Sequence, residues 1–333
     1  MTTSSSTKEQ ARGRSGKGHP QHPLPLLAAA VAGAAMAVQA RANGALAAHL
    51  GSAPWAALWS FGSGLMVLTC GLLLLPRSRG GLRQVGVALR AQHLRWWEVL
   101  GGLGGAFFIA VQSFAVPQTG VALFTIALVG GQTASSLMVD RLGLGPAGIS
   151  PLSAGRVLAA LATLGGVSVA SMSRSSGADH GVALLAIALT ILAGGAMAVQ
   201  QAINGKLNVA SKDVIATTFV NFAWGTLALG LWGGGLLASG RVGVPELGHV
   251  PWWSLVGGLI GVGYVAAMAA LVRSLGVLVA ALLSLAGQLV MAVVIDVVTG
   301  SAPVTGSLLL GVLTTLAAAA MAGLATRGSR VSE

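Results

Sequence analysis

Amide side chains occur twice in the sequence at one spacing, four residues apart inside apolar stretches. Gln39 and Asn43 form the first pair, and Gln200 and Asn204 form the second. Residues four apart share a helix face, and an amide in hydrocarbon costs free energy unless it is paired. Each pair should therefore face the interior of a helix bundle, where it could bind a polar substrate or hydrogen-bond a neighbouring helix, a bond typically worth ~0.6 kcal/mol.

The depth of the two glutamines leaves two arrangements open. At about 1.5 Å per residue, Gln39 would lie roughly 22 Å beyond Leu24, in the outer half of a membrane. Gln200 would lie in the inner half, on an oppositely directed helix. The two motifs are then either walls of one substrate pocket or related gates.

Other polar and aromatic residues inside apolar stretches are also candidates for substrate binding. They are Asn221, Tyr264, Trp59, Trp224, Gln132 and Gln288. The phenol of Tyr264 needs a hydrogen-bond partner in the middle of a span, which suits a cavity. Gln132 and Gln288 each follow a glycine, so close helix packing explains them equally well, and the tryptophans also suit contact with lipid or core.

Three charged residues are candidates for selectivity or gating. Arg41 carries the one fixed charge well inside an apolar stretch, and such an arginine costs ~2.5–3.5 kcal/mol at mid-membrane on insertion scales. It either selects an anionic substrate or extends its charge to the interface. Asp140 and Asp296 end two predicted helices and are either interfacial charges or gating residues.

The sequence gives little support to enzyme chemistry. It contains no Gly-x-Ser-x-Gly or His-Glu-x-x-His motif, and all six histidines fall in tails, loops or span ends. No carboxylate is predicted at mid-membrane, which argues against proton coupling through a buried acid. We therefore expect no catalytic residue, no cofactor and no metal site.

The composition identifies the setting of these residues. Of 333 residues, 54% are hydrophobic and 8% are charged, and the mean hydropathy is +0.81, whereas soluble domains average about 25% charged residues. The chain cannot cover an ordinary water-facing surface, so we expect an all-α membrane protein. The net charge is +11, and almost all of the basic residues lie between apolar stretches. In such positions they orient a membrane protein and do not indicate nucleic-acid binding.

Ten stretches are long and apolar enough to cross a bilayer, which takes roughly 20 residues per helix. They cover 24–47, 54–75, 97–116, 119–139, 153–172, 182–206, 214–237, 253–272, 275–297 and 306–326. Sixteen of the nineteen Lys and Arg residues then fall on one side and two on the other, with Arg41 inside the first span. This positive-inside asymmetry places both termini in the cytoplasm.

An internal repeat divides the chain into two copies. Residues 35–46 match residues 196–207 at eight of twelve positions, at an offset of 161, and a second register at an offset of 156 pairs Asp140 with Asp296. Each copy holds five spans, and an odd number means that the second copy enters the membrane from the opposite side. Such inverted repeats recur in secondary transporters.

The predicted organisation follows from the spans and the repeat. It comprises a disordered basic cytoplasmic leader (1–23), a first five-helix repeat (24–172), a linker (173–181), a second five-helix repeat (182–326) and a cytoplasmic tail (327–333).

The repeated motif carries a family resemblance. Gln39-x-x-x-Asn43-Gly44, followed by Ser60-Phe61-x-x-Gly64, resembles the YdcZ-like branch of the drug/metabolite transporter superfamily. The second copy keeps Gln200, Asn204 and Gly205 but has Asn221 in place of the serine. The resemblance implies a bacterial cytoplasmic-membrane protein of ten helices with both ends inside.

The function expected from these observations is secondary transport by alternating access. The substrate would be a small polar or amphipathic metabolite, and export is what the resemblance implies. The expected partners are this small molecule and the lipid bilayer, and a homodimer is left open. The alternatives are a passive pore, a non-transporting membrane assembly factor and, with least support, a membrane-embedded enzyme.

Overall fold

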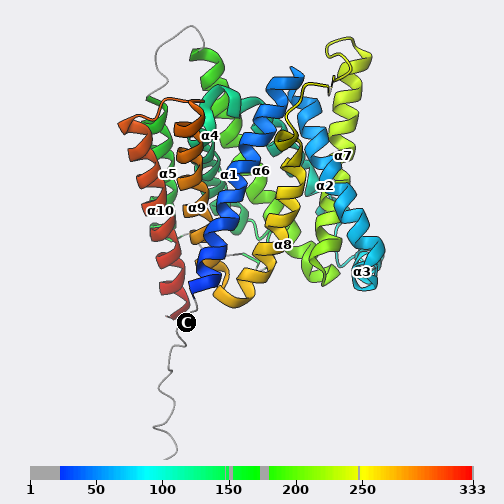
Figure 1. Ribbon diagram of the computed structural model, residues 1–333. Helices are drawn as coiled ribbons and strands as arrows, with labels where there is room; N and C mark the ends of the chain where they lie inside the picture. Colours follow the sequence, from blue (N-terminus) through cyan, green and yellow to red (C-terminus); the bar gives the residue numbers. More distant parts are fainter. Residues whose placement is uncertain (1–22, 147, 150–152, 173–179, 247, 332–333) are drawn as a thin grey trace, which may run out of the picture.

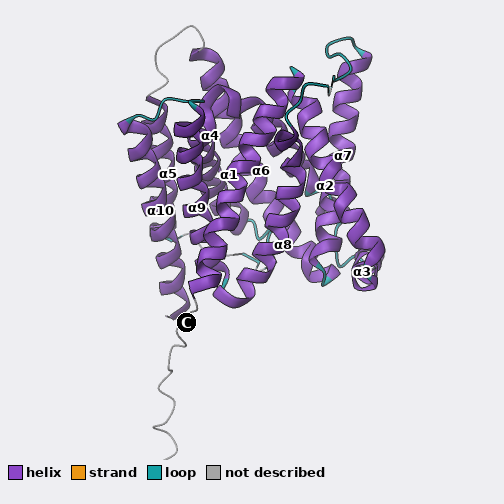
Figure 2. Ribbon diagram, viewed as in Figure 1, coloured by secondary structure: helices purple, strands orange, loops and turns teal. Residues whose placement is uncertain are grey.

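The computed structural model describes residues 23–331 except 147, 150–152, 173–179 and 247. The expected leader therefore lies outside the described residues apart from Pro23, as does most of the expected linker. The described chain is helical and contains no strand (Figure 2). Its α-helices are α1 (Pro23–Leu50), α2 (Ala53–Leu74), α3 (Pro76–Arg90), α4 (Gly102–Arg141), α5 (Ala154–Ser171), α6 (His180–Ser211), α7 (Val214–Ala238), α8 (Gly257–Leu275), α9 (Val277–Thr299) and α10 (Gly306–Val331), with 3₁₀ turns at Trp96–Val99 and Trp252–Val256.

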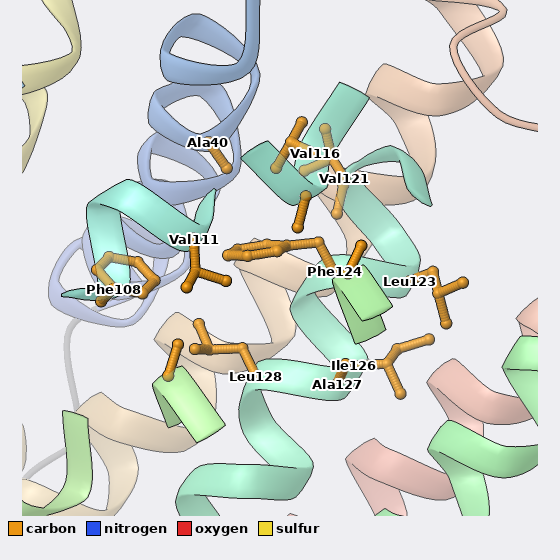
Figure 3. Packing of buried hydrophobic residues seen from close by; sticks show 14 of the residues in the cluster. Ala40, Phe108, Val111, Val116, Val121, Leu123, Phe124, Ile126, Ala127 and Leu128 are labelled. Atoms are coloured by element: carbon orange, nitrogen blue, oxygen red, sulfur yellow. The ribbon is translucent and has the colours of Figure 1, made fainter. Parts of the chain in front are cut away.

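Helix α4 is a hairpin of two helical segments. In a straight helix Phe108 and Phe124 would lie about 24 Å apart, but their ring centroids are 6.2 Å apart. The chain turns back at Gly120, whose φ of 78° and ψ of 171° interrupt the helix. Figure 3 shows Val111 from the first segment packed near Phe124 and Leu128 from the second. The two stretches predicted at 97–116 and 119–139 are thus separate, antiparallel segments.

Helices α8 and α9 form a second hairpin with the same kind of turn. Gly276 joins them with φ of 79° and ψ of 158°, a conformation that is open to glycine and strained for other residues. Gly120 and Gly276 are related by the offset of 156. Two positions matched in the sequence repeat therefore share an unusual backbone conformation.

Eight described helices are long and apolar enough to cross a membrane. One of the eight is the α4 hairpin, and Gly306–Ala322 of α10 is a shorter apolar helix. Counting the hairpin as two, the apolar helical segments coincide with the ten predicted stretches. The chain is thus a multi-pass membrane protein, although α10 continues to Val331, through most of the expected tail.

One segment expected as a loop is helical. Residues 76–90 form α3, which is amphipathic: Val85 is buried together with Ser78 and Gly81, while its arginines lie on the other face. In Figure 1, α3 lies at the same end of the bundle as the start of α1 and the end of α10. The basic residues of this loop therefore lie on an ordered helix at the end where both described termini meet.

The centre of the bundle is the α4 hairpin. Its residues from Val121 to Gly131 are all buried, and the main hydrophobic cluster includes Phe108, Val111, Leu123, Phe124 and Ile126 (Figure 3). Small residues let the neighbouring helices approach it closely, since a Cβ at Gly131 would overlap the backbone carbonyl of Ile191 on α6. Helix association in membranes depends on such close backbone contacts.

Candidate functional site

A small cavity of about 130 Å³ lies where six helices meet. Its lining comes from α1, α2, α4, α6, α7 and α8: Met36, Gln39, Ser60, Phe61, Gly105, Phe108, Ile109, Met197, Gln200, Phe222, Gly261, Tyr264 and Val265. None of these thirteen residues is charged. Of the predicted binding residues, Gln39, Gln200 and Tyr264 line the cavity.

The lining follows the sequence repeat. Twelve of the thirteen residues form six pairs at the offsets of 161 or 156. The pairs are Met36 with Met197, Gln39 with Gln200, Phe61 with Phe222, Gly105 with Gly261, Phe108 with Tyr264, and Ile109 with Val265. Equivalent residues of the two copies therefore meet around one space.

Gln39 and Gln200 line the same cavity, which is the geometry expected of two walls of one pocket. Gln39 is 5% exposed, and its Oε1 is buried without a hydrogen-bond partner. Gln200 donates from Nε2 to Oδ1 of Asn221 at 3.1 Å, and its Oε1 is likewise buried and unpaired. The depth estimate misplaced them because α1 continues to Leu50 and α6 to Ser211, beyond the predicted span ends, so each glutamine lies nearer the middle of its helix.

Two glycines make room for these amides in the same way. A Cβ at Gly261 would lie 2.8 Å from Nε2 of Gln39, and a Cβ at Gly105 would lie 2.8 Å from Nε2 of Gln200. Each glutamine thus packs against a glycine of the opposite copy. Any larger residue at either glycine would displace the amide.

An aromatic pair forms an apolar wall of the cavity. The rings of Phe61 and Phe222 stack with centroids 4.7 Å apart and planes 25° apart. Each ring occupies the space left by a glycine of the other copy, because a Cβ at Gly64 would overlap Phe222 and a Cβ at Gly225 would overlap Phe61. Sequence reasoning did not select this pair, although both rings lie in the repeated motif.

The predicted asparagines pack between helices around the cavity. Asn43 is fully buried and donates from Nδ2 to Oε1 of Gln112 at 2.7 Å. A Cβ at Gly101 would lie 2.9 Å from Oδ1 of Asn204, and Gly257 stands in the equivalent position against Asn43. Neither asparagine lines the cavity, whereas Asn221 supports it by binding Gln200.

The other uncharged candidates lie outside the cavity lining. Trp59 donates from Nε1 to the carbonyl of Leu255 at 3.0 Å, and both Trp59 and Trp224 keep over a third of their surface exposed. Gln132 and Gln288 are half-buried next to Gly131 and Gly287, and those glycines press against backbone carbonyls of neighbouring helices. This geometry favours the packing interpretation of both glutamines.

Arg41 also lies outside the cavity lining. Its guanidinium lies over the ring of Trp253, 5.7 Å from the ring centroid, and its Nε is buried without a partner. At the other copy, Lys206 lies over Trp97, 6.0 Å from that centroid. Trp97 and Trp253 are equivalent in the repeat, so a cation stacked on this tryptophan is a shared structural feature. Arg41 therefore contacts Trp253 and is not among the residues that line this cavity.

Glu98 is a buried acid that sequence reasoning missed. It is 4% exposed, receives a hydrogen bond from Nζ of Lys206 at 2.9 Å and another from the N–H of Arg95 at 2.7 Å. Burial disfavours ionisation, but the bond from Arg95 and the charge of Lys206 outweigh it and lower the pKa of Glu98. The sequence signal that could have identified Glu98 is its position directly after two tryptophans in a basic segment.

The two predicted gating aspartates have different partners. Asp140 forms an ion pair with Arg156 of α5. Asp296 is fully buried and accepts hydrogen bonds from the backbone N–H groups of Val121 and Ala122, at 2.9 and 2.8 Å. Equivalent residues of the repeat therefore differ in their contacts.

Comparison with known families agrees with this paired arrangement. Residues 24–169 and 185–322 match the family model DMT_YdcZ, described as "Putative inner membrane exporter, YdcZ". The chain belongs to this YdcZ family. The two matched segments coincide with the two copies of the repeat, and the YdcZ assignment agrees with the resemblance carried by Gln39, Asn43 and Gly44. No curated protein matches the chain.

Proposed function

We propose that this YdcZ-family protein is a secondary transporter that exports a small, uncharged, amphipathic molecule by alternating access. The observation that carries the proposal is the cavity in which twelve of the thirteen lining residues are equivalent residues of the two copies. A binding site at the interface of two repeats is the arrangement that secondary transporters use. The proposal includes ten membrane crossings, two inverted five-helix repeats and cytoplasmic termini.

Reciprocal contacts support the inverted repeats. Ala30 of α1 approaches Gly287 of α9 as Ile191 of α6 approaches Gly131 of α4. The same reciprocity relates the phenylalanine–glycine and glutamine–glycine contacts around the cavity. Two copies that exchange the same contacts are related by an approximate twofold axis, and five spans per copy put that axis in the membrane plane.

A difference in burial supports alternation between two conformations. The first segment of α4 is buried along most of its length, whereas its equivalent, α8, has only Gly257, Gly258, Gly261 and Leu275 buried. A pocket of about 480 Å³ follows α8 from Ala266 to Arg273 and includes Arg77 of α3. This pocket thus lies along α8 between the cavity residues Tyr264 and Val265 and the end where α3 lies.

The lining supports an uncharged substrate. A charged molecule would lose its hydration and find no opposite charge among the thirteen lining residues. An uncharged molecule with an N–H or O–H group could pair with the amide oxygens of Gln39 and Gln200, and buried oxygens left unpaired cost about 1–3 kcal/mol each. Phe61, Phe222 and the two methionines would hold its apolar part.

Binding is tested with three probes of one shape and different charge: benzamide, benzoate and benzylammonium. Purified protein in nanodiscs should bind benzamide, measured as a rise in melting temperature. Gln39→Leu and Gln200→Leu should each weaken binding by about tenfold through the lost hydrogen bond. Gln132→Leu, outside the cavity, is the matched control and should bind normally. Preference for either charged probe would contradict the uncharged substrate.

Transport is tested in proteoliposomes with the probe that binds. A transporter gives saturable uptake and counterflow above the leak of protein-free liposomes. Flux without saturation or counterflow would identify a passive pore. Flux equal to that of empty liposomes would contradict transport.

A further inference from the structure

Asp296 closes the turn of the α4 hairpin. Its Oδ1 and Oδ2 accept the N–H groups of Val121 and Ala122, the first residues after Gly120. Ser301 donates from Oγ to Oδ1 at 3.0 Å. The first N–H groups of a helix have no partner within the helix and attract negative charge. The carboxylate of α9 therefore caps the second segment of α4.

The equivalent contact at the other hairpin is not made. The residues equivalent to Val121 and Ala122 are Val277 and Leu278 of α9, and the residue equivalent to Asp296 is Asp140. Asp140 instead pairs with Arg156, and within the described residues no side chain hydrogen-bonds to the N–H of Val277 or Leu278. Val277 is 70% exposed, whereas Val121 is 0% exposed.

The surroundings of the two turn glycines differ in the same sense. A Cβ at Gly120 would lie 2.5 Å from Cβ of Ala302 and 2.8 Å from Oδ2 of Asp296, whereas a Cβ at Gly276 would meet nothing within 4 Å. In Figure 1 the turn between α8 and α9 lies at the end with α3, and the far end of α9 lies opposite. One end of the bundle is therefore sealed at its hairpin, and the other is open.

We propose that Asp296 and Asp140 are alternating latches. In the conformation seen here Asp296 holds the turn at Gly120. In the opposite conformation Asp140 leaves Arg156 and binds the N–H groups of Val277 and Leu278, while Asp296 releases the α4 turn. The inference rests on the proposed function, because alternating access requires the two copies to exchange conformations.

Arg156 sets the balance between the two states. Ser153 at the start of α5 accepts a hydrogen bond from the N–H of Arg156, and Thr305 at the start of α10 accepts one from the N–H of Leu308. Arg156 and Leu308 therefore occupy equivalent positions in their helices. Asp140 thus has a competing cation that Asp296 lacks at the equivalent position. The ion pair stabilises the state in which Asp140 is held away from the α8–α9 turn.

The test compares two equivalent positions by the rate of maleimide labelling. Val121→Cys and Val277→Cys are made separately in a Cys70→Ser background, because Cys70 is the native thiol and is exposed. In nanodiscs the cysteine at 277 should react fast and that at 121 slowly. Arg156→Leu, which restores the equivalence with Leu308, should slow labelling at 277 and speed labelling at 121, each by about tenfold, the worth of a charged hydrogen bond.

Two further variants distinguish the latch from a local loss of structure. Asp296→Ala should speed labelling at 121 and also slow it at 277, whereas simple fraying at Gly120 would change 121 alone. Adding Asp140→Asn to Arg156→Leu should restore fast labelling at 277. If labelling at 277 is the same in wild type, Arg156→Leu and Asp296→Ala, the latch is wrong. Counterflow that persists in that case would leave the proposed transport intact.

Discussion

Phe61 and Phe222 stack 4.7 Å apart, and each ring fills the space beside a glycine of the other copy. The pair joins α2 to α7 at the cavity wall, so its packing links the stability of the bundle to the shape of the cavity. Because Gly64 and Gly225 stand in equivalent positions, the same steric argument applies on both sides.

Gly64→Ala and Gly225→Ala should each destabilise the protein. The added Cβ would overlap the opposite ring, and such overpacking typically costs about 1–3 kcal/mol. Gly62→Ala is the matched control, since a Cβ there meets nothing within 4 Å and alanine favours helix by up to about 1 kcal/mol. Melting temperatures in nanodiscs should fall for the first two variants and hold or rise for the third. Equal values for all three would contradict the packing shown.

Gln39→Glu should change the charge preference of the cavity. The glutamate keeps the shape of the glutamine but brings a buried carboxylate without a protein partner, and such a charge is stabilised by a cation. Benzylammonium should then bind more tightly than benzamide, the reverse of wild type. Gln39→Leu should bind neither probe well. Retention of the benzamide preference by Gln39→Glu would place the substrate elsewhere.

Gly120→Ala should be more damaging than Gly276→Ala. Both glycines have φ near +79°, so each substitution bears a backbone strain of about 1–3 kcal/mol. At Gly120 the methyl group would also collide with Ala302 and Asp296. Thermal unfolding should separate the two variants, and a larger loss in Gly276→Ala would argue against the sealed turn.

Glu98 predicts a loss of stability in acid. Folding lowers the pKa of Glu98 below its ordinary value of 4.5. Its pair with Lys206 therefore contributes its full stability at pH values above 4.5. This contribution is lost as the pH falls through the lower pKa of the folded protein. The melting temperature of wild type should fall between about pH 5 and pH 3. Glu98→Gln should be less stable at pH 7 and flatter in this range. Glu246→Gln, at an exposed residue, should follow wild type.

Much of the fold could be predicted because the lengths of the apolar stretches and the internal repeat are both visible in the sequence. The hairpin turns were located as short joins, but their geometry depends on Gly120 and Gly276, and glycine occurs 49 times in the chain. Helix α3 was missed because its four arginines made the segment resemble a loop, while its small apolar face was too weak to predict a helix.

The cavity was only partly predictable. Polarity selected Gln39, Gln200 and Tyr264, because a polar side chain in an apolar stretch costs free energy unless it has a partner. Phe61, Met36 and Met197 gave no such signal, since aromatic and sulfur-containing side chains are ordinary in a membrane helix. Arg41 was selected by the cost of its charge, but sequence alone could not show that Trp253 lies beneath it.

Tyr264 and Phe108 are equivalent residues that both line the cavity, and only Tyr264 carries a hydroxyl, which lies 3.3 Å from Oγ of Ser284. If two identical five-helix chains formed this space, every change would appear on both sides, and a guest could sit either way round. Joining the copies in one polypeptide removes that restriction. A molecule between these walls meets unlike faces, so the protein can hold it in a single orientation.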